Sequence, residues 1–407
     1  MHAYCVVHPR LRVKRDQCVC RKRFTIVLKK GGMNPVCRNV LRPLSNVCPL
    51  YCTVIHNVVY DVRRFDHPGG HVFMKLCGGL DATELFEMSH VNNDRVATVL
   101  ASLHVVGHTE HPPRYDFERY AHLRTIVKKL LPTRASRSAS SATNAYVLVC
   151  AISALVVHIA LVVHIQPLTI AWFTFCLLSA FLNTLLGAYG HNGVHRLHPH
   201  ALGLDWNGLS SFEWLSEHVM SHHPHVNTER DHDAMSLEPI FAWLPGRIGV
   251  FGHAQTAWFR HVVYAFSEVI VPLQGTIVHA TRWRAMKYGA PMWMSLAPVV
   301  FLMRISSYFL LHAPHHATLT IFATMCPAGY LFSTLAHLSH DYVSDTSATC
   351  VVTCQLANTR DIEPFGLTGV LSLFLDRQRA HHLFPTVDHT RLTRELVMAT
   401  RMIDPVK

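Results

Sequence analysis

The sequence has few charged residues for its length. Only 15% of its 407 residues are Asp, Glu, Lys or Arg, whereas 50% are apolar. This composition excludes a disordered or fibrous protein and disfavours one that is entirely water-soluble. Acidic residues are especially scarce, because 26 Asp and Glu stand beside 32 His, many of them in close groups. An excess of clustered imidazoles over carboxylates is typical of proteins that bind a metal or haem.

A basic surface for nucleic acid is also missing. The formal net charge is +11, but residues 1–46 alone contain 11 Lys and Arg and one acidic residue, Asp16. The rest of the chain is therefore nearly neutral, and we expect no DNA or RNA partner. The 12 Cys follow no repeating spacing. We interpret them as reduced thiols because a disulfide framework would show such a spacing.

The first 144 residues divide into three parts. Residues 1–46 have no sustained apolar periodicity, and we predict a disordered basic extension, or a stretch that precedes a true start near Met33. A targeting presequence is disfavoured because no amphipathic stripe is present. Residues 47–108 contain a β-rich run, CTVIHNVVYDV, a turn at DHPGG and short helical stretches, which indicates a small α+β domain. Residues 109–144 are polar and rich in Ser and Arg, and we expect a flexible linker.

Residues 145–407 contain four long apolar stretches, at 145–165, 168–190, 291–311 and 317–338. Each is long enough to cross a bilayer, which predicts an all-α membrane domain with four spans. Arg304 should face the other helices, because a central arginine costs roughly 2.5–3.5 kcal/mol on insertion scales. The flanking Lys and Arg residues fall on one side of the predicted spans, and the positive-inside rule assigns that side to the cytosol.

Three groups of histidines have helical spacing on this predicted cytosolic side. His191 and His195 are four residues apart, and His218, His222 and His223 are at i, i+4 and i+5. His381 and His382 follow Gln378 at i+3 and i+4, and His340 comes just after the last span. Surface or core histidines would explain one such group. Three groups on the same side of a membrane favour two metal ions with open positions, although spacing alone does not distinguish iron, zinc or copper.

The segment VVYDVRRFDHPGGHVF, followed by GGLDATELFEMSH, resembles the cytochrome b5 haem-binding domain. The resemblance implies that His67 and His90 are the axial ligands of haem b. An iron with both axial positions filled cannot bind O2, so such a domain transfers single electrons. One departure is Cys52, which stands where that family usually has Trp.

The region from Ala145 to the C-terminus resembles the membrane fatty-acid desaturases with three histidine boxes, on the motifs HNGVH, HVMSHHPHVNT and QRAHHLFPTVDH. The Gln in the third box, together with a cytochrome b5 domain, is similar to front-end acyl desaturases and the related sphingolipid desaturases. The resemblance implies two Fe ions, with Gln378 as a weak ligand or the holder of a bridging water. The implied iron ligands are His191, His195, His218, His222, His223, His340, His381 and His382.

The expected activity follows from the substrate that such a protein would meet. An unactivated methylene has no acidic proton, so general acid–base groups or a Ser or Cys nucleophile cannot attack it. We therefore expect a fatty acyl desaturase that uses O2 as co-substrate and acts towards the carboxyl end of an acyl lipid or acyl-CoA. Electrons would come from NADH through a cytochrome b5 reductase and the haem domain. The expected location is the endoplasmic reticulum membrane, multi-pass, with the haem domain and histidine boxes in the cytosol.

Three alternatives stay open at this point. A sphingolipid desaturase or a hydroxylase could use the same scaffold, because the position of the methylene decides the product. A membrane metal-binding or transport protein would need its ligands near the bilayer midplane. A non-catalytic haem electron carrier is suggested by the missing Trp.

Overall fold

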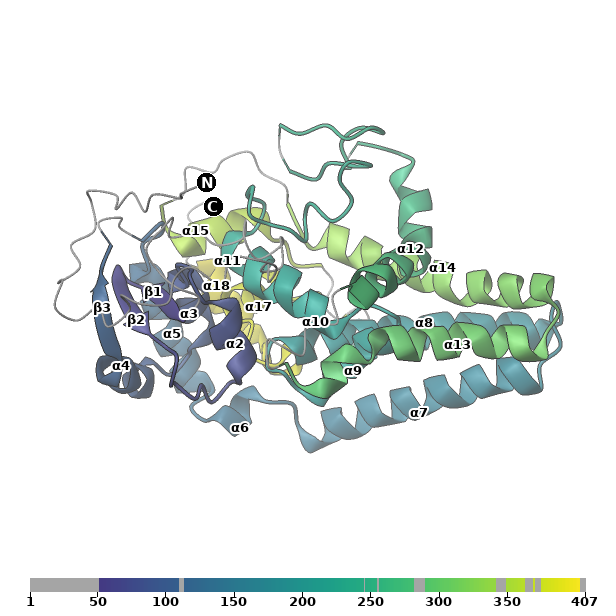
Figure 1. The fold of residues 1–407 in the computed structure, drawn as a ribbon, viewed down its shortest axis with the longest axis horizontal. Coiled ribbons are helices and arrows are strands. Elements are labelled where there is room, and N and C mark those ends of the chain that lie inside the picture. Colours follow the sequence, from purple (N-terminus) through teal and green to yellow (C-terminus); the bar gives the residue numbers. More distant parts are fainter. Residues whose placement is uncertain are drawn as a thin grey trace, which may run out of the picture.

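The computed structural model describes residues 51–109, 113–244, 246–254, 256–281, 290–341, 349–362, 369 and 375–402. The predicted extension 1–46 lies outside the described residues. Figure 1 shows a small mixed domain at one end of the molecule and long, roughly parallel helices at the other. The C-terminal helices lie between these two parts.

The small domain begins with a β-hairpin. Strands β1 (Cys52–Ile55) and β2 (Val58–Asp61) pair antiparallel, and β3 (His104–His108) adds to β2. His56 and Asn57 between β1 and β2 both have positive φ, at 48° and 66°, as a type I′ turn requires. Helices α2 (His71–Leu76), α3 (Thr83–Ser89) and α4 (Asn93–Ser102) follow β2. The expected small α+β domain is confirmed, and Cys52 is buried at the start of β1.

Four apolar helices form the elongated part of the molecule. They are α7 (Ser141–Val163), α8 (Ile170–Val194), α13 (Ala297–Leu311) and α14 (Pro314–Leu338). Three helical segments are long and apolar enough to cross a membrane, at Arg134–Val163, Ile170–Val194 and Pro314–Leu338. The predicted third span contains only a 15-residue helix, α13, preceded by a 3-10 turn at Met292–Ser295. The count of four spans is therefore not confirmed.

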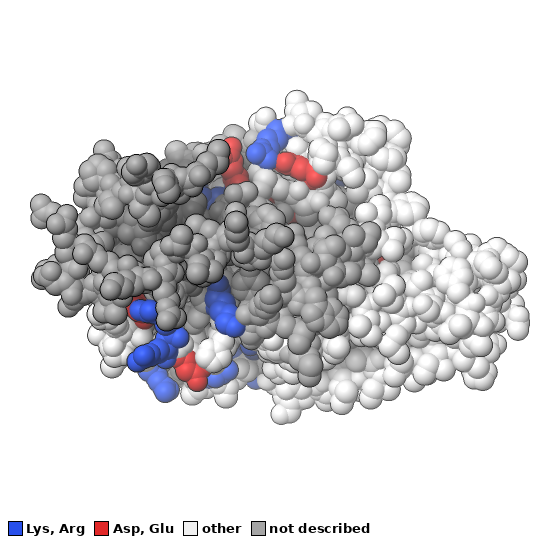
Figure 2. Space-filling view, viewed as in Figure 1, with Lys and Arg blue, Asp and Glu red and all other residues white. Residues whose placement is uncertain are grey.

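Arg304 faces the other helices, as predicted. It is 5% exposed, its Nη1 donates to the Trp206 carbonyl at 2.7 Å, and its guanidinium lies 4.8 Å from the Trp206 ring centroid. On the face drawn in Figure 2, the end of the molecule formed by the long helices shows no charged side chains among the described residues. This surface suits contact with lipid, because charged groups are costly there.

The region expected to be a flexible linker instead contains packed helices. Helix α5 (Glu118–Leu130) buries Tyr120, Leu123 and Val127 completely, in one core with residues of the small domain and of the C-terminal segment. A short helix, α6 (Arg134–Arg137), then leads into α7. The polar composition hid these apolar positions, which recur at helical spacing on one face of α5.

The other elements are one further helix of 22 residues and several short segments. They are η2 (Pro199–Ala201), α9 (Leu202–Trp206), α10 (Ser211–Trp214), η3 (Leu215–His222), α11 (His223–His225), α12 (Arg260–Thr281), α15 (Val351–Asn358), α17 (Gln378–Leu383), η6 (His389–Arg391) and α18 (Arg394–Met402). The three histidine groups belong to α8 and its end, to η3 with α11, and to α17.

Candidate metal centre

The first histidine pair sits where α8 ends. The helix continues through Val194, so His191 lies in its last turn and His195 is its C-cap. Gly193 lets the following segment pack closely, because a Cβ there would lie 2.5 Å from the Ala201 backbone nitrogen. The predicted span ended at Gly190, and the longer helix brings both imidazoles to its inner face.

The second group depends on an unusual helix. Residues Leu215–His222 form a π-helix, and the His223 amide donates to the His218 carbonyl five residues earlier. The wider turn places residue i+5 above residue i, which an α-helix would not do. As a result, the Nε2 atoms of His218 and His223 are 3.1 Å apart.

All eight histidines proposed as iron ligands converge in one place, which we call the histidine cage. Within it, two groups can each hold a metal ion, and the ligand atoms of each group lie within 4.8 Å of one another. Each cage side chain is at most 8% exposed. One group contains His191, His195, His218, His223 and His381, and the other contains His222, His340 and His382.

The Nε2 atoms face inward at close range. His191 Nε2 is 3.2 Å from that of His381, and His340 Nε2 is 3.0 Å from His222 and 3.1 Å from His382. Imidazole nitrogens bind a zinc ion at about 2.0–2.1 Å, so two ligands at right angles around such an ion are about 3 Å apart. The spacing of the cage nitrogens therefore fits shared metal ions.

Hydrogen bonds to the outer nitrogens determine which nitrogen of each ring carries the proton. His222 Nδ1 lies 2.8 Å from Asp231, His218 Nδ1 lies 2.7 Å from Asp233, and His382 Nδ1 lies 3.0 Å from the Gln355 carbonyl oxygen Oε1. Each partner accepts a hydrogen bond, so the proton belongs on Nδ1 and the lone pair of Nε2 points inward. Converging lone pairs repel one another unless a cation lies between them. The donor set thus fits bound metal.

Burial keeps most of the cage uncharged. It lowers the pKa of His218, His223, His381 and His382 well below the usual value for histidine. It also lowers the pKa of His340 to about 4. At His222 burial acts in the same direction, but the adjacent Asp231 carboxylate outweighs it and raises the pKa. Neutral imidazole is the form that binds metal.

Gln378 lies at the edge of the three-histidine group, with its amide nitrogen 3.4 Å from His340 Nε2. The amide oxygen is buried without a hydrogen-bond partner. Because the two ends of an amide are nearly interchangeable in shape, that oxygen can instead face the cage. His337, three residues before His340, packs against the Trp243 ring and lies outside the cage.

Sequence reasoning missed the carboxylates and the histidine behind the cage. Asp231 and Asp233 follow the second box in the run NTERDHDA, whose three acidic residues in an acid-poor chain were the available signal. His389 Nε2 lies 2.9 Å from His381 Nδ1. Asp388 accepts from Asn192 at 2.8 Å and from Arg196 at 2.6 Å. Burial would raise its pKa, but Arg196 and the Thr390 hydroxyl lower it to about 2.

The two histidines predicted to ligate haem face each other in the small domain. The ring centroids of His67 and His90 are 5.9 Å apart, with the planes at 81°. Burial lowers the pKa of His67 to about 4 and also lowers that of His90, so both rings are neutral, as haem ligands must be. A Cβ at Gly69 would lie 2.7 Å from His67 Cε1, which explains the glycine after HP. These features fit a haem held between the rings.

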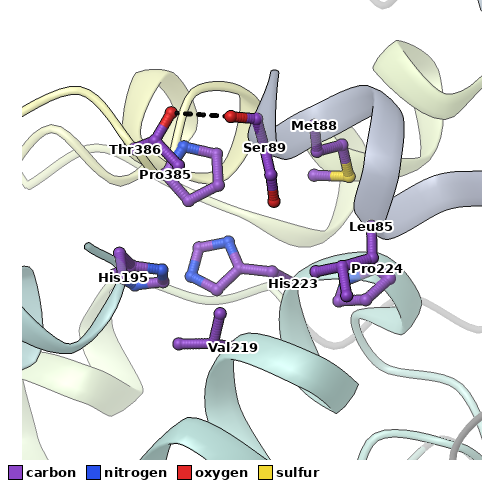
Figure 3. A pocket seen from close by; sticks show the side chains of 9 residues that line it. All are labelled: Leu85, Met88, Ser89, His195, Val219, His223, Pro224, Pro385 and Thr386. Carbon is purple, nitrogen blue, oxygen red and sulfur yellow. Dashed lines mark hydrogen bonds between the residues drawn. The ribbon is translucent and has the colours of Figure 1, made fainter. Parts of the chain in front are cut away.

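The small domain touches the cage directly. A cavity of about 10 Å³ lies between them. Figure 3 shows Ser89 and Thr386 on one side of it and His195 and His223 on the other. The Thr386 hydroxyl donates to the Ser89 carbonyl at 3.3 Å. The remaining lining residues are Leu85, Met88, Val219, Pro224 and Pro385. Helix α3, whose C-cap is His90, therefore lies against the cage.

Comparison with known families agrees with both parts of the molecule. The family model described as fatty acid desaturase matches residues 167–398, and the model described as cytochrome b5-like heme/steroid binding domain matches residues 49–110. The chain belongs to the fatty acid desaturase family. This desaturase is thus an oxidoreductase with a fused cytochrome b5 domain, as the sequence resemblance implied, and its long apolar helices embed it in a membrane.

Three curated relatives match most of the desaturase chain. An acyl-lipid (7-3)-desaturase of Diacronema lutheri is 29% identical over 379 residues, which cover 83% of this chain and 81% of the relative. The protein of the same name from Rebecca salina is 27% identical, with coverage of 83% and 81%. A chloroplastic acyl-lipid (7-3)-desaturase of Chlamydomonas reinhardtii is 25% identical, with coverage of 81% and 71%. No match was found among solved structures.

Proposed function

We propose that this desaturase acts on acyl chains carried by membrane lipids and inserts a double bond on the carboxyl side of an existing one. Two relatives that share most of their length with it are named acyl-lipid desaturases, which favours a lipid-bound substrate over acyl-CoA. The fused haem domain and Gln378 in the third box support front-end regiochemistry. Each double bond would consume O2, two electrons and two protons, and yield two waters.

The observation that supports this reaction best is the histidine cage. Its two groups of inward nitrogens are suited to hold two iron ions, with His191, His195, His218, His223 and His381 at one and His222, His340 and His382 at the other. Bound iron would supply the activation of O2 that breaking an unactivated C–H bond requires. The protein's own part is to fix the rings, exclude water and keep the histidines neutral.

Carboxylates behind the cage orient its ligands. Asp231 is completely buried and also accepts from the Asn227 backbone nitrogen at 2.7 Å, so its position beside His222 is fixed. Asp233 acts in the same way on His218. Partners of this kind set the orientation and basicity of metal-bound imidazoles.

His67 and His90 would hold the haem that receives single electrons from NADH through a cytochrome b5 reductase. We propose that the haem-binding domain and the histidine cage lie on the cytosolic side of the endoplasmic reticulum membrane. The relative named chloroplastic makes a plastid membrane the alternative, and fluorescence microscopy of the tagged full-length chain distinguishes the two.

The position of the cage supports catalysis over transport. His191 lies in the last turn of α8, and His340 comes after the end of α14 at Leu338. A carrier would need its ligands in the middle of the spans, where they could be exposed to each side in turn.

The test is expression of the full-length chain in yeast supplied with individual unsaturated fatty acids, followed by gas chromatography of separated lipid classes. We expect a new unsaturated acyl chain in membrane lipids. The product should be absent from a variant with His381→Ala and His382→Ala. It should be present in the control variant His315→Ala, because His315 is exposed and belongs to none of the histidine boxes. Hydroxylated products or altered sphingoid bases would assign the chain to the corresponding alternative reaction. Unchanged lipids, with an intact haem spectrum, would contradict desaturation.

A further inference from the structure

The contact between the haem-binding domain and the desaturase domain is apolar on two sides. Met88 and Val91 belong to a buried core that also contains Leu123 of α5 and Leu383 of α17. Leu85 belongs to a second core, together with Val72 and Leu76 of the haem-binding domain and Val194, Leu204 and Val219 of the desaturase domain. Domains joined by a large apolar contact do not move independently, whereas smaller and more polar contacts allow motion. The packing therefore describes a docked domain.

A buried ion pair links α3 of the haem-binding domain to α5. Arg124 of α5 is 4% exposed, and its guanidinium donates to the Glu87 carboxylate and, at 3.1 Å, to the Glu87 carbonyl. His56 Nε2 lies 2.6 Å from the other carboxylate oxygen of Glu87. A buried pair in which one partner is removed leaves an uncompensated charge, so its geometry is strongly constrained.

Helix α5 also holds the segment that follows the third histidine box. The Tyr120 hydroxyl donates to the Leu383 carbonyl at 2.8 Å and lies 3.4 Å from the Met88 carbonyl. Leu383 directly follows His382 of the cage, while Met88 lies two residues before His90. One helix thus contacts both the haem-ligand segment and the cage-ligand segment.

We propose that Arg124 is a positioning residue that holds the His90 end of α3 against the histidine cage, so that electrons cross a preassembled contact without movement of the haem-binding domain. This inference rests on the proposed function. NADH would supply two electrons, which pass one at a time through the reductase and the haem. Together with two protons and the two hydrogens removed from the acyl chain, these electrons would reduce O2 to two waters.

The experiment compares full-length variants in yeast microsomes. Arg124→Met keeps the length of the side chain and removes its charge and donors. Lys129→Met is the matched control, because Lys129 is an exposed cation on the same helix. Two readouts besides product are measured: the rate at which NADH-reduced haem is reoxidised in the presence of O2 and acyl lipid, and cross-linking of Asp94 to Lys128 by a carbodiimide. These two side chains form an ion pair of 3.1 Å between α4 and α5, and Asp94 is 87% exposed to the reagent.

We expect Arg124→Met to retain the haem spectrum, lose most of the cross-link and slow haem reoxidation and product formation together by at least about tenfold. Displacements of about 1 Å can cost as much as 10²-fold where two reacting groups must be aligned. Lys129→Met should match the parent in all three. Arg124→Lys should recover part of the rate, because it restores the charge but not the forked donors.

Two results would overturn the proposal. One is an Arg124→Met protein with parental cross-linking and reoxidation, and the other is loss of the cross-link with no loss of rate, which would show that electrons pass from an undocked domain. If Arg124→Met fails to accumulate or loses haem, Tyr120→Phe, which removes one hydroxyl, provides the same comparison with a smaller expected effect. If the unsubstituted protein reoxidises its haem and forms the Asp94–Lys128 cross-link but makes no product, the proposed function is contradicted. The docking proposal can still be tested in that case, because the cross-link and the reoxidation rate do not depend on product formation.

Discussion

The two histidine sites of the molecule are built differently. His67 and His90 are half-buried on short segments of a small domain, and His67 belongs to a loop. The cage histidines are nearly inaccessible, and carboxylate, amide or carbonyl groups fix several of their outer nitrogens. The difference indicates separate tasks. An electron entry site must stay reachable for a reductase, whereas a site for O2 chemistry must exclude water and hold its geometry.

The largest effect should come from breaking the smaller group of the cage. His340→Ala leaves only His222 and His382 in it, and we expect loss of one bound iron and of all detectable product, with the haem spectrum unchanged. Iron per haem, measured by elemental analysis of purified protein, checks this. His337→Ala is the control, because its ring packs against Trp243 outside the cage. Full activity of the His340 variant would remove it from the ligand set.

A second substitution removes the haem site and leaves the histidine cage intact. His90→Ala should abolish the haem absorbance and reduce product formation to background, while cage iron is retained, because the two centres have no ligand in common. Absorption spectra and elemental analysis of the same preparation measure both. Sustained product formation without haem would mean that electrons reach the cage by another route.

The carboxylates behind the cage should have intermediate and unequal effects. Asp231→Asn and Asp233→Asn each remove an acceptor that fixes a histidine, and such changes typically cost about 10–100-fold in metal affinity. We expect the larger loss for Asp231, whose side chain is fully buried, whereas that of Asp233 is 32% exposed and water can replace it. Competition with an iron chelator ranks the two, and equal affinities would contradict the role assigned to burial.

The smallest effect is expected at Gln378. Gln378→Ala removes one amide beside His340, and we expect a rate loss of about two- to tenfold, the equivalent of a net hydrogen bond of about 0.5–1.5 kcal/mol. Product formation at saturating substrate measures it. A loss as complete as that of His340→Ala would instead make Gln378 a full ligand.

Parts of the fold followed from local pattern. The apolar stretches, the β-rich run at residues 52–62 and the short helices of the small domain are each encoded within about 20 residues, and hydrophobic periodicity detects them. The division of the β-rich run into two paired strands with a turn at His56 and Asn57 came only from the structure. Strand β3 was missed because its residues, HVVGH, are mostly exposed or half-buried and alternate weakly. The packing of α5 was missed because a polar face dominates its composition, and its buried face is explained only by contacts with residues far away in the sequence.

The sequence by itself determined which side chains could bind metal, because each histidine box brings several imidazoles together within one short segment. The π-helix that aligns His218 with His223 was not part of that prediction. Only the tertiary structure decided how the boxes divide into two groups, which carboxylates contact their outer nitrogens, and that Arg124 of α5 pairs with Glu87 of the haem-binding domain. Spacing describes neighbours along one helix. Contacts between residues such as His340 and His382, or Glu87 and Arg124, arise only when separate elements pack, because a polar group that loses water on burial is stabilised by a partner from another element.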